Sequence, residues 1–168
     1  MNTASKLSLT VVALLALGAT AAQAQSANIT ATAMVQTALT VTNVQDLDFG
    51  AVFPGQGDQT IAPTDATSGR FSLAGALGAQ INMTFSLPAT LTGPGTPMAI
   101  GTWTGLQGNS ATPVGAAFDP TSSPVVATLD ATSGNWYVFL GATLTVPAVQ
   151  TAGTYNGTIT LDAVYTGN

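Results

Sequence analysis

Asp46 and Asp48 are the closest pair of acidic residues in this chain. Two carboxylates at this spacing can exchange protons in acid–base catalysis, or supply part of the roughly six to eight oxygens that surround Ca²⁺. Alternate residues of a strand also point to the same side, and a strand edge beside a turn is the better explanation of the pair. No EF-hand loop or glycine–aspartate repeat supplies further ligands. We therefore predict neither a catalytic residue nor a metal site.

The residue types on which most enzymes depend are missing from the sequence. The 168 residues include no His, Cys or Glu, and the only basic residues are Lys6 and Arg70. The chain therefore has no ordinary general base near neutral pH, no thiolate, and no nitrogen or sulfur ligand for a metal. We expect a protein that is not an enzyme and that uses no cofactor.

Trp103 and Trp136 are the side chains best suited to contact a ligand, because indole rings form platforms for sugars. The other aromatic residues are spread over most of the predicted strands, as side chains that fill a core usually are. Both interpretations of the two tryptophans remain open at this point, and their exposure decides between them.

The first residues of the chain have the features of an export signal. Lys6 precedes an apolar stretch from Leu7 to Leu17, and Ala22-Gln23-Ala24 offers the small residues that signal peptidase recognises. We predict a signal peptide over residues 1–24. The apolar stretch has about half of the roughly 20 residues that a bilayer span requires, so we predict no transmembrane segment.

Removal of residues 1–24 leaves 168 − 24 = 144 residues, which fit a single domain over residues 25–168. These residues include one Arg and seven Asp, which give a formal charge of 1 − 7 = −6. Nucleic acid binding needs a basic surface that one arginine cannot supply, so it is excluded. Without disulfides, the stability of an exported domain depends on its core, on backbone pairing, or on assembly.

The composition predicts an all-β domain of about eight to ten strands. Thr, Val, Gly and Ala dominate, and no segment has a clear helical period. Pro and Gly clusters separate the strands at the short spacing that is typical of a two-sheet sandwich. The predicted strands cover residues 28–42, 47–53, 58–62, 69–74, 79–87, 98–104, 114–118, 124–129, 135–146 and 153–165.

The first and the last of these strands carry regular alternation of apolar and polar residues. In the first, the apolar face includes Ile29, Ala31, Ala33 and Val35. In the last, it includes Tyr155, Ile159, Leu161 and Tyr165. A free strand at each end indicates subunits that lend strands to one another.

Three segments resemble a family of secreted bacterial domains of unknown function: Leu39 to Gly55, Gly141 to Val146, and Ala152 to Tyr165. Members of that family share a Leu-x-Phe-Gly block and a Gly-Thr-Tyr ending. The ending is also similar to that of chaperone–usher fimbrial subunits, in which a glycine and a near-terminal aromatic residue frame the last strand. Gly153 and Tyr165 take these positions here.

The resemblance implies an immunoglobulin-like, pilin-like sandwich that is incomplete by itself. The N-terminal extension of the next subunit supplies the missing strand, so that Gln25 to Val35 is the donor and Gln36 to Thr42 is the native first strand. The alternative is that the whole run belongs to the first strand of its own domain. Asn156-Gly157 then lies within a continuous last strand, although this dipeptide is also a strong hairpin signal.

We therefore expect a structural protein outside the cell, a pilin-like subunit that assembles by strand donation into fibres or an adhesive coat. The alternative is a monomeric secreted module that binds a glycan or a protein. The resemblance implies that the partners are further copies or related pilin-like subunits, together with a periplasmic chaperone and an outer-membrane usher. It also implies passage through the periplasm of a Gram-negative bacterium to the cell surface.

Overall fold

The computed structural model describes residues 25–167 except Met34 and Gln36, so the predicted signal peptide lies outside the described residues. The chain divides into two units, Met1–Met34 and Val35–Asn168. The described part of the first unit is exposed and has no secondary structure. The second unit contains every strand described below. Among the described residues, no helix has the length and apolar character needed to cross a membrane.

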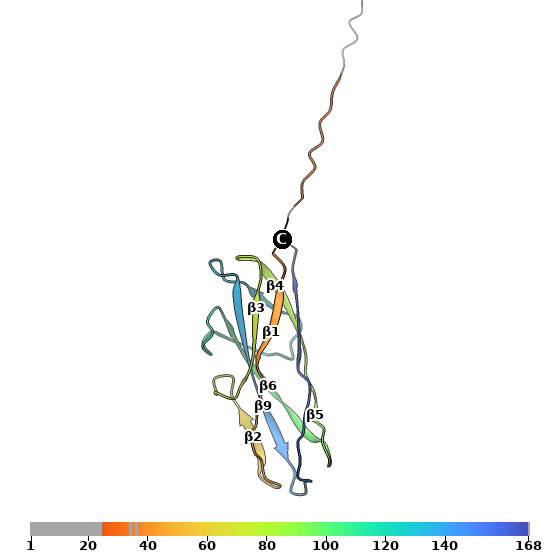
Figure 1. Cartoon of the computed structure of the whole chain (residues 1–168), viewed down its shortest axis with the longest axis vertical. Coiled ribbons are helices and arrows are strands. Elements are labelled where there is room, and N and C mark those ends of the chain that lie inside the picture. The colour runs from red at the N-terminus through yellow and green to blue at the C-terminus, as the bar shows by residue number, and fades with distance from the viewer. Residues whose placement is uncertain (1–24, 34, 36, 168) are drawn as a thin grey trace, which may run out of the picture. The chain divides into compact units, whose positions relative to one another are not determined.

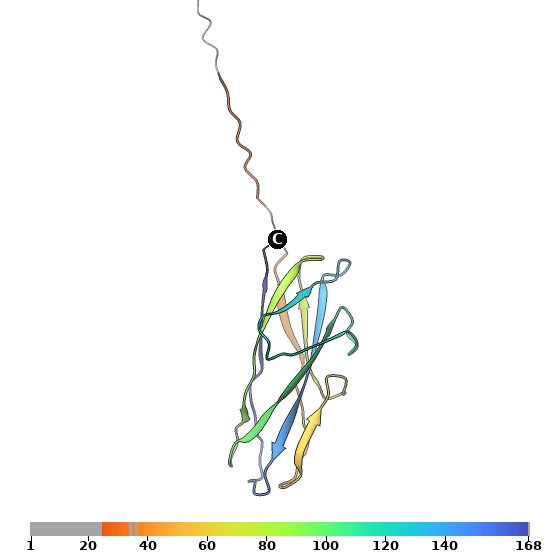
Figure 2. The same ribbon diagram turned by 180° about the vertical axis from the view of Figure 1, so that it is seen from behind.

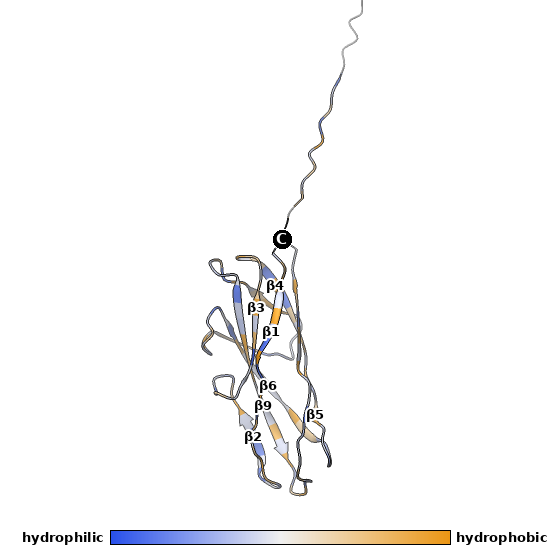
Figure 3. Ribbon diagram, in the orientation of Figure 1, coloured by the Kyte–Doolittle hydropathy of each residue, from blue (hydrophilic) through white to orange (hydrophobic). Residues whose placement is uncertain are grey.

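The second unit is an all-β sandwich, as predicted (Figure 1). Its strands, all paired in antiparallel fashion, are β1 (Thr40–Gln45), β2 (Gly57–Ile61), β3 (Gly69–Ala74), β4 (Gln80–Ser86), β5 (Thr90–Leu91), β6 (Met98–Gly108), β7 (Ala116–Phe118), β8 (Val125–Thr128), β9 (Asn135–Val146) and β10 (Thr160–Tyr165). Hydrophobic and hydrophilic residues occur on the same strands, as the colours of Figure 3 show. This mixture places one face of each sheet in the core and the other in solvent.

The two sheets differ in size. The larger has the order β1-β3-β9-β6-β5, with β2 also paired to β9 and β7 to β6. The smaller contains only β10, β4 and β8 in that order. Strand β9 is the centre of the larger sheet, because its first half pairs with β3 and its second half with β2. Strands β1 and β10 are edge strands of different sheets, so each has one edge free of ladder pairing.

A core fills the space between the two sheets. Its fully buried side chains include Leu73 of β3, Ile81 and Met83 of β4, and Val138 and Leu140 of β9. Both sheets contribute because alternate residues of each strand face inward. Burial of a residue such as Leu73 removes enough apolar surface from water to contribute about 2 kcal/mol.

Most of the predicted strands are confirmed. Strands β3 and β9 have the predicted bounds, and β2, β4, β7 and β8 agree to within about two residues, the usual uncertainty of a strand end. Strand β6 extends to Gly108, beyond the predicted end at residue 104. A bulge between Gly101 and Thr104 interrupts its register, and Thr102 there has a φ of 46°. The short β5 was not predicted, because two residues carry no periodic pattern.

The first predicted strand, over residues 28–42, is wrong for most of its length. Residues 28–33, 35 and 37–39 lie outside any strand, and β1 begins only at Thr40. The predicted strand over residues 47–53 is also absent. Alternation shows which residues could share a face, but a strand forms only where a neighbouring backbone supplies hydrogen bonds. Within the described residues, the segment 47–53 has only a single backbone hydrogen bond of this kind, from the Asp48 N–H to the Thr67 carbonyl at 3.0 Å, and residues 28–33 and 35 have none.

The last predicted strand, over residues 153–165, is correct only from Thr160 onward. Gly153, Tyr155 and Ile159 lie before β10, in a segment whose only pairing is the bridge between Asn156 and Thr92. Strand β4 ends at Ser86, so the residues before Thr160 have no ladder partner there. The hairpin alternative at Asn156-Gly157 is wrong, because Asn156 forms this bridge in place of a turn.

Candidate functional site

The small sheet covers only part of the inner face of the large sheet. A second cluster of buried residues continues along β6 and β9 beyond the main core: Met98, Ile100, Ala142, Leu144 and Val146. No residue of β4, β8 or β10 packs on this cluster. It is covered by side chains of two segments without strand structure, among them Leu47, Phe49 and Tyr155. This half of the sandwich therefore lacks a regular second layer.

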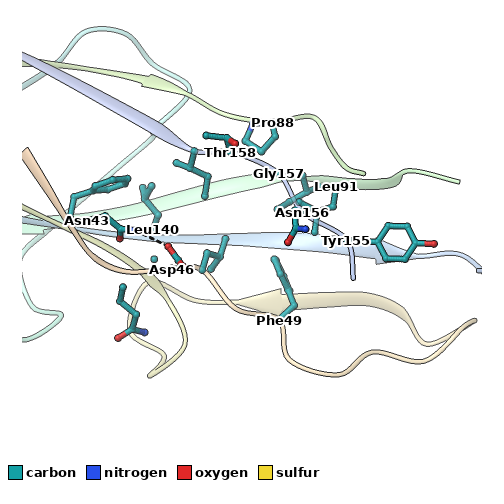
Figure 4. A pocket seen from close by; sticks show the side chains of 16 residues that line it. Asn43, Asp46, Phe49, Pro88, Leu91, Leu140, Tyr155, Asn156, Gly157 and Thr158 are labelled. Atoms are coloured by element: carbon teal, nitrogen blue, oxygen red, sulfur yellow. Dashed lines mark hydrogen bonds between the residues drawn. The ribbon is translucent and has the colours of Figure 1, made fainter. Parts of the chain in front are cut away.

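A groove runs between those two segments. It consists of two cavities with volumes of about 390 and 730 Å³ that share six lining residues: Asp46, Leu47, Phe49, Leu91, Tyr155 and Asn156. The first cavity reaches toward the main core at Leu140 and Phe71, and the second reaches Leu144 and Val146. Figure 4 shows Asp46 and Phe49 along one side of the first cavity, with Tyr155 and Asn156 on another. We refer to the two cavities together as the groove.

The first wall of the groove is the segment 43–54, which continues from β1. Leu47, Phe49 and Val52 pack against the cluster under the groove. Asp46 and Asp48 are exposed and form local hydrogen bonds: Asp46 accepts one from the Asn43 side-chain amide at 2.7 Å, and Asp48 accepts one from the Gly50 N–H at 2.8 Å. The sequence pair is thus explained by the shape of this wall.

The second wall is the segment 150–159, which leads into β10. Three contacts hold it to the loop after β5: Gln150 donates to the Thr96 carbonyl at 2.6 Å, and Asn156 and Thr92 exchange two backbone hydrogen bonds of 2.8 and 2.9 Å. The Tyr155 hydroxyl donates to the Thr151 carbonyl at 2.9 Å. These contacts hold one edge of the second wall against β5 and the loop that follows it. The other edge of the wall faces the groove.

Both walls present unused backbone groups. The N–H and C=O groups of Gly157, Thr158 and Ile159 form no hydrogen bond with any other described residue, and the same is true of Phe49 and Ala51. Extended backbone with free donors and acceptors, beside exposed apolar side chains, is the arrangement that accepts an added strand.

The predicted acceptor residues divide between the groove and the core. Gly153, Tyr155 and Ile159 line the groove. Leu161 is buried in the main core, and Tyr165 is half-buried at the end of β10. The predicted donor residues Ile29, Ala31 and Ala33 belong to the first unit and Val35 begins the second, and all four are exposed. Ile29 and Val35 each expose 97% of their surface.

The two tryptophans are not brought together. Trp103 packs against the cluster under the groove, whereas Trp136 packs against the main core and donates a hydrogen bond to Gln107 at 3.2 Å. Both are half-buried. Trp103 lies near Ala142 in the register of β6 and β9, six residues from Trp136, a separation of about 20 Å along a strand. They do not form a common platform.

The carboxylates do not gather into a site within the described part of the chain, where no three His, Cys, Asp or Glu side chains lie together. Asp130 has the most altered pKa: hydrogen bonds from Asn109 and from Ser133 lower the pKa of this carboxyl to about 2. Hydrogen bonds from Thr121 also lower the pKa of Asp119. Both carboxylates stabilise loops by accepting hydrogen bonds from backbone N–H groups, and neither residue lines the groove.

The sequence analysis missed the floor of the groove. Leu91 lies in β5, which the sequence does not predict, and Met98 and Ile100 lie in β6, where no pattern marks them as part of a site. Only the pairing of β5 and β6 with the second half of β9 places them beside the two walls. No local sequence pattern contains that information.

Comparison with known proteins places the chain in a family. The chain has no match among curated proteins. The profile of one family, described as a domain of unknown function (DUF4402), matches residues 39–165, which include all ten strands and both walls of the groove. The protein therefore belongs to the DUF4402 family.

Proposed function

We propose that this protein is a structural, pilin-like subunit in which the N-terminal segment 25–35 of one copy fills the groove of the next. The observation that carries the proposal is the half-covered inner face of the large sheet, with a strand-shaped groove above Leu144 and Val146. The polymer lies outside the cell after removal of residues 1–24. A periplasmic chaperone would cover the groove before assembly.

The donor segment has the properties that such an exchange requires. It makes no described hydrogen bond and leaves Ile29 and Val35 almost fully exposed, so it is available to a neighbour. Eleven residues in extended conformation span about 36 Å. The first wall, residues 43–54, has nearly the same number of residues.

The spacing of apolar residues suggests a register. Ile29, Ala31, Ala33 and Val35 alternate over seven residues, and so do the buried residues Leu140, Ala142, Leu144 and Val146 of β9. In the proposed register Ile29 lies above Leu140 and Val35 lies above Val146. The two large donor side chains then occupy the two ends of the groove, and the alanines cross its middle.

The direction of the donor follows from where the chain enters the domain. Thr37 lies beside Tyr165, and Thr40 pairs with Ala74, both at the end of the sandwich where β10 finishes (Figure 1). The groove extends toward the opposite end, near Val146 and Gly153. A donor that arrives from another copy at that end runs parallel to the first wall and antiparallel to the second.

The expected energetics are favourable. Burial of the four apolar donor side chains contributes on the order of 5 kcal/mol before the entropy cost of ordering the segment. Hydrogen bonds to the unused backbone groups of both walls are added to this.

The absence of cysteine permits a direct test by disulfide cross-linking. In the proposed register Ile29 reaches the cavity that Leu140 and Ile159 line. The mature protein with Ile29→Cys and Ile159→Cys is therefore expected to give a ladder of covalent oligomers under oxidising conditions, read on non-reducing denaturing gels. Each single substitution gives at most dimers.

The matched control is Val35→Cys with Ile159→Cys. Val35 lies six residues away from Ile29 along the donor, about 20 Å, whereas a disulfide needs Cα atoms within about 7 Å. This pair is expected to give no ladder. Equal cross-linking of both pairs, or a cross-link confined to monomers in the first pair, would contradict strand donation between copies.

A further inference from the structure

The end of the domain at which the groove opens carries exposed apolar residues outside the groove. Phe53 exposes 69% and Val149 88% of its surface, on two loops joined by a 2.7 Å hydrogen bond from the Gly55 N–H to the Pro147 carbonyl. Residues 53–55 and 147–149 include no charged side chain. We call these six residues the distal end; Figure 2 shows its two loops at the end opposite the C-terminus.

The opposite end, where the chain enters the domain, carries a similar feature. The loop 75–78 contains Leu77, which exposes 63% of its surface. The Gly75 N–H donates to the Gly134 carbonyl at 3.0 Å, and the Ala76 N–H donates to the Tyr165 hydroxyl at 2.7 Å, so both sheets hold this loop in place. We call residues 37–38 and 75–78 the proximal end; they also include no charged side chain.

The length of the connecting chain forces the two ends together if the proposed function holds. With Val35 above Val146 of the acceptor, only residues 36–38 separate the donor from Leu39, which packs against the core of its own domain. The four Cα–Cα steps from Val35 to Leu39 span at most about 14 Å. The proximal end of one copy must then lie against the distal end of the next.

We propose that the proximal end of each copy, at Leu77, packs against the distal end of the next copy, around Phe53 and Val149. This inference rests on the proposed strand donation and adds a second contact to it. The residues that define the two ends carry no charge, although Asp130 adjoins the proximal loop, where its carbonyl accepts a hydrogen bond from the Gly78 N–H at 3.4 Å. The proposed contact is therefore made by uncharged residues. Its few apolar side chains bury too little surface to hold two copies by themselves. The contact sets the angle between successive copies and therefore the stiffness of the polymer.

Charge substitutions at the two ends test this contact. The mature protein is made with Val149→Asp, with Leu77→Lys, and with both; Val149 does not line the groove, so the donor site is preserved. Each single variant is expected to keep the oligomer ladder on unboiled gels and to lose at least half of the persistence length of its fibres in electron micrographs. The double variant restores the stiffness, because opposite charges then face each other.

The matched control is Val114→Asp, an exposed valine (58%, against 88% for Val149) that lies at neither end. It is expected to leave both the ladder and the stiffness unchanged. Fibres of the Val149→Asp and Leu77→Lys variants as stiff as those of the unmodified protein would overturn the end contact alone, as would a double variant no stiffer than the singles. The absence of a ladder from the unmodified protein would overturn the strand donation as well.

Discussion

The hydroxyl of Tyr165 joins the end of the last strand to the beginning of the domain, since it donates a hydrogen bond of 2.8 Å to the Thr37 carbonyl. The same oxygen accepts a hydrogen bond from the Ala76 N–H at 2.7 Å. One side chain of the small sheet thereby holds both the entry of the chain and the loop after β3. This clamp fixes the point from which the N-terminal segment leaves the domain.

Replacement of Tyr165 by Phe removes this clamp and keeps the aromatic ring. Two hydrogen bonds of about 1 kcal/mol each are lost, so the free energy of unfolding is expected to fall by about 1–3 kcal/mol in urea denaturation. Tyr137→Phe is the control. Tyr137 is also half-buried, and its hydroxyl forms no hydrogen bond with any described residue. An equal effect of the two substitutions would show that the hydroxyl of Tyr165 has no special role.

The floor of the groove belongs to the folded core even though no strand covers it. Leu144 exposes 1% of its surface, so Leu144→Ala is expected to lower the free energy of unfolding by about 2–4 kcal/mol. Val126→Ala, at an outward position with 51% exposure, should change it by no more than about 0.5 kcal/mol. A loss below about 1 kcal/mol at Leu144 would mean that the second cluster is poorly packed.

Low pH is expected to reduce the stabilising contribution of the Asp130 carboxylate to its loop. Its folded-state pKa of about 2 lies below the ordinary value of 3.8, so the charged carboxylate stabilises the fold fully above about pH 4 and this contribution disappears as the pH falls toward 2. Asp130→Ala is therefore expected to be less stable than the unmodified protein at pH 7, with a difference that shrinks between pH 4 and pH 2. Thermal unfolding across this range measures it, and a difference independent of pH would contradict the assignment.

Local patterns in the sequence were sufficient to predict the fold class and the central strands. Gly69–Ala74 and Asn135–Val146 carry apolar residues at a spacing of two and are bounded by Gly or Asp turns, and both strands have the predicted bounds. These segments pair on both edges within the chain, so their local preference and their tertiary environment agree.

The predictions failed where alternation lacks a partner. Residues 28–39 and 153–159 alternate as strands do, yet their described residues join no strand ladder, and Asn156 forms only an isolated bridge with Thr92. Periodicity reports which face a residue would take, whereas pairing depends on which strands adjoin in the fold. The groove was not predictable for the same reason, because its floor depends on the register of β6 against β9.

Negative-stain electron microscopy of the mature protein, beside unboiled gel electrophoresis, tests the central claim most directly when it is repeated without residues 25–35. Residues 25–33 and Val35 are exposed and belong to no strand, so the shortened protein should stay folded. Strand donation predicts fibres and a detergent-resistant ladder from the mature protein, and folded monomers from the deletion. Polymers that persist unchanged in the deletion, or a mature protein that stays monomeric, would contradict it.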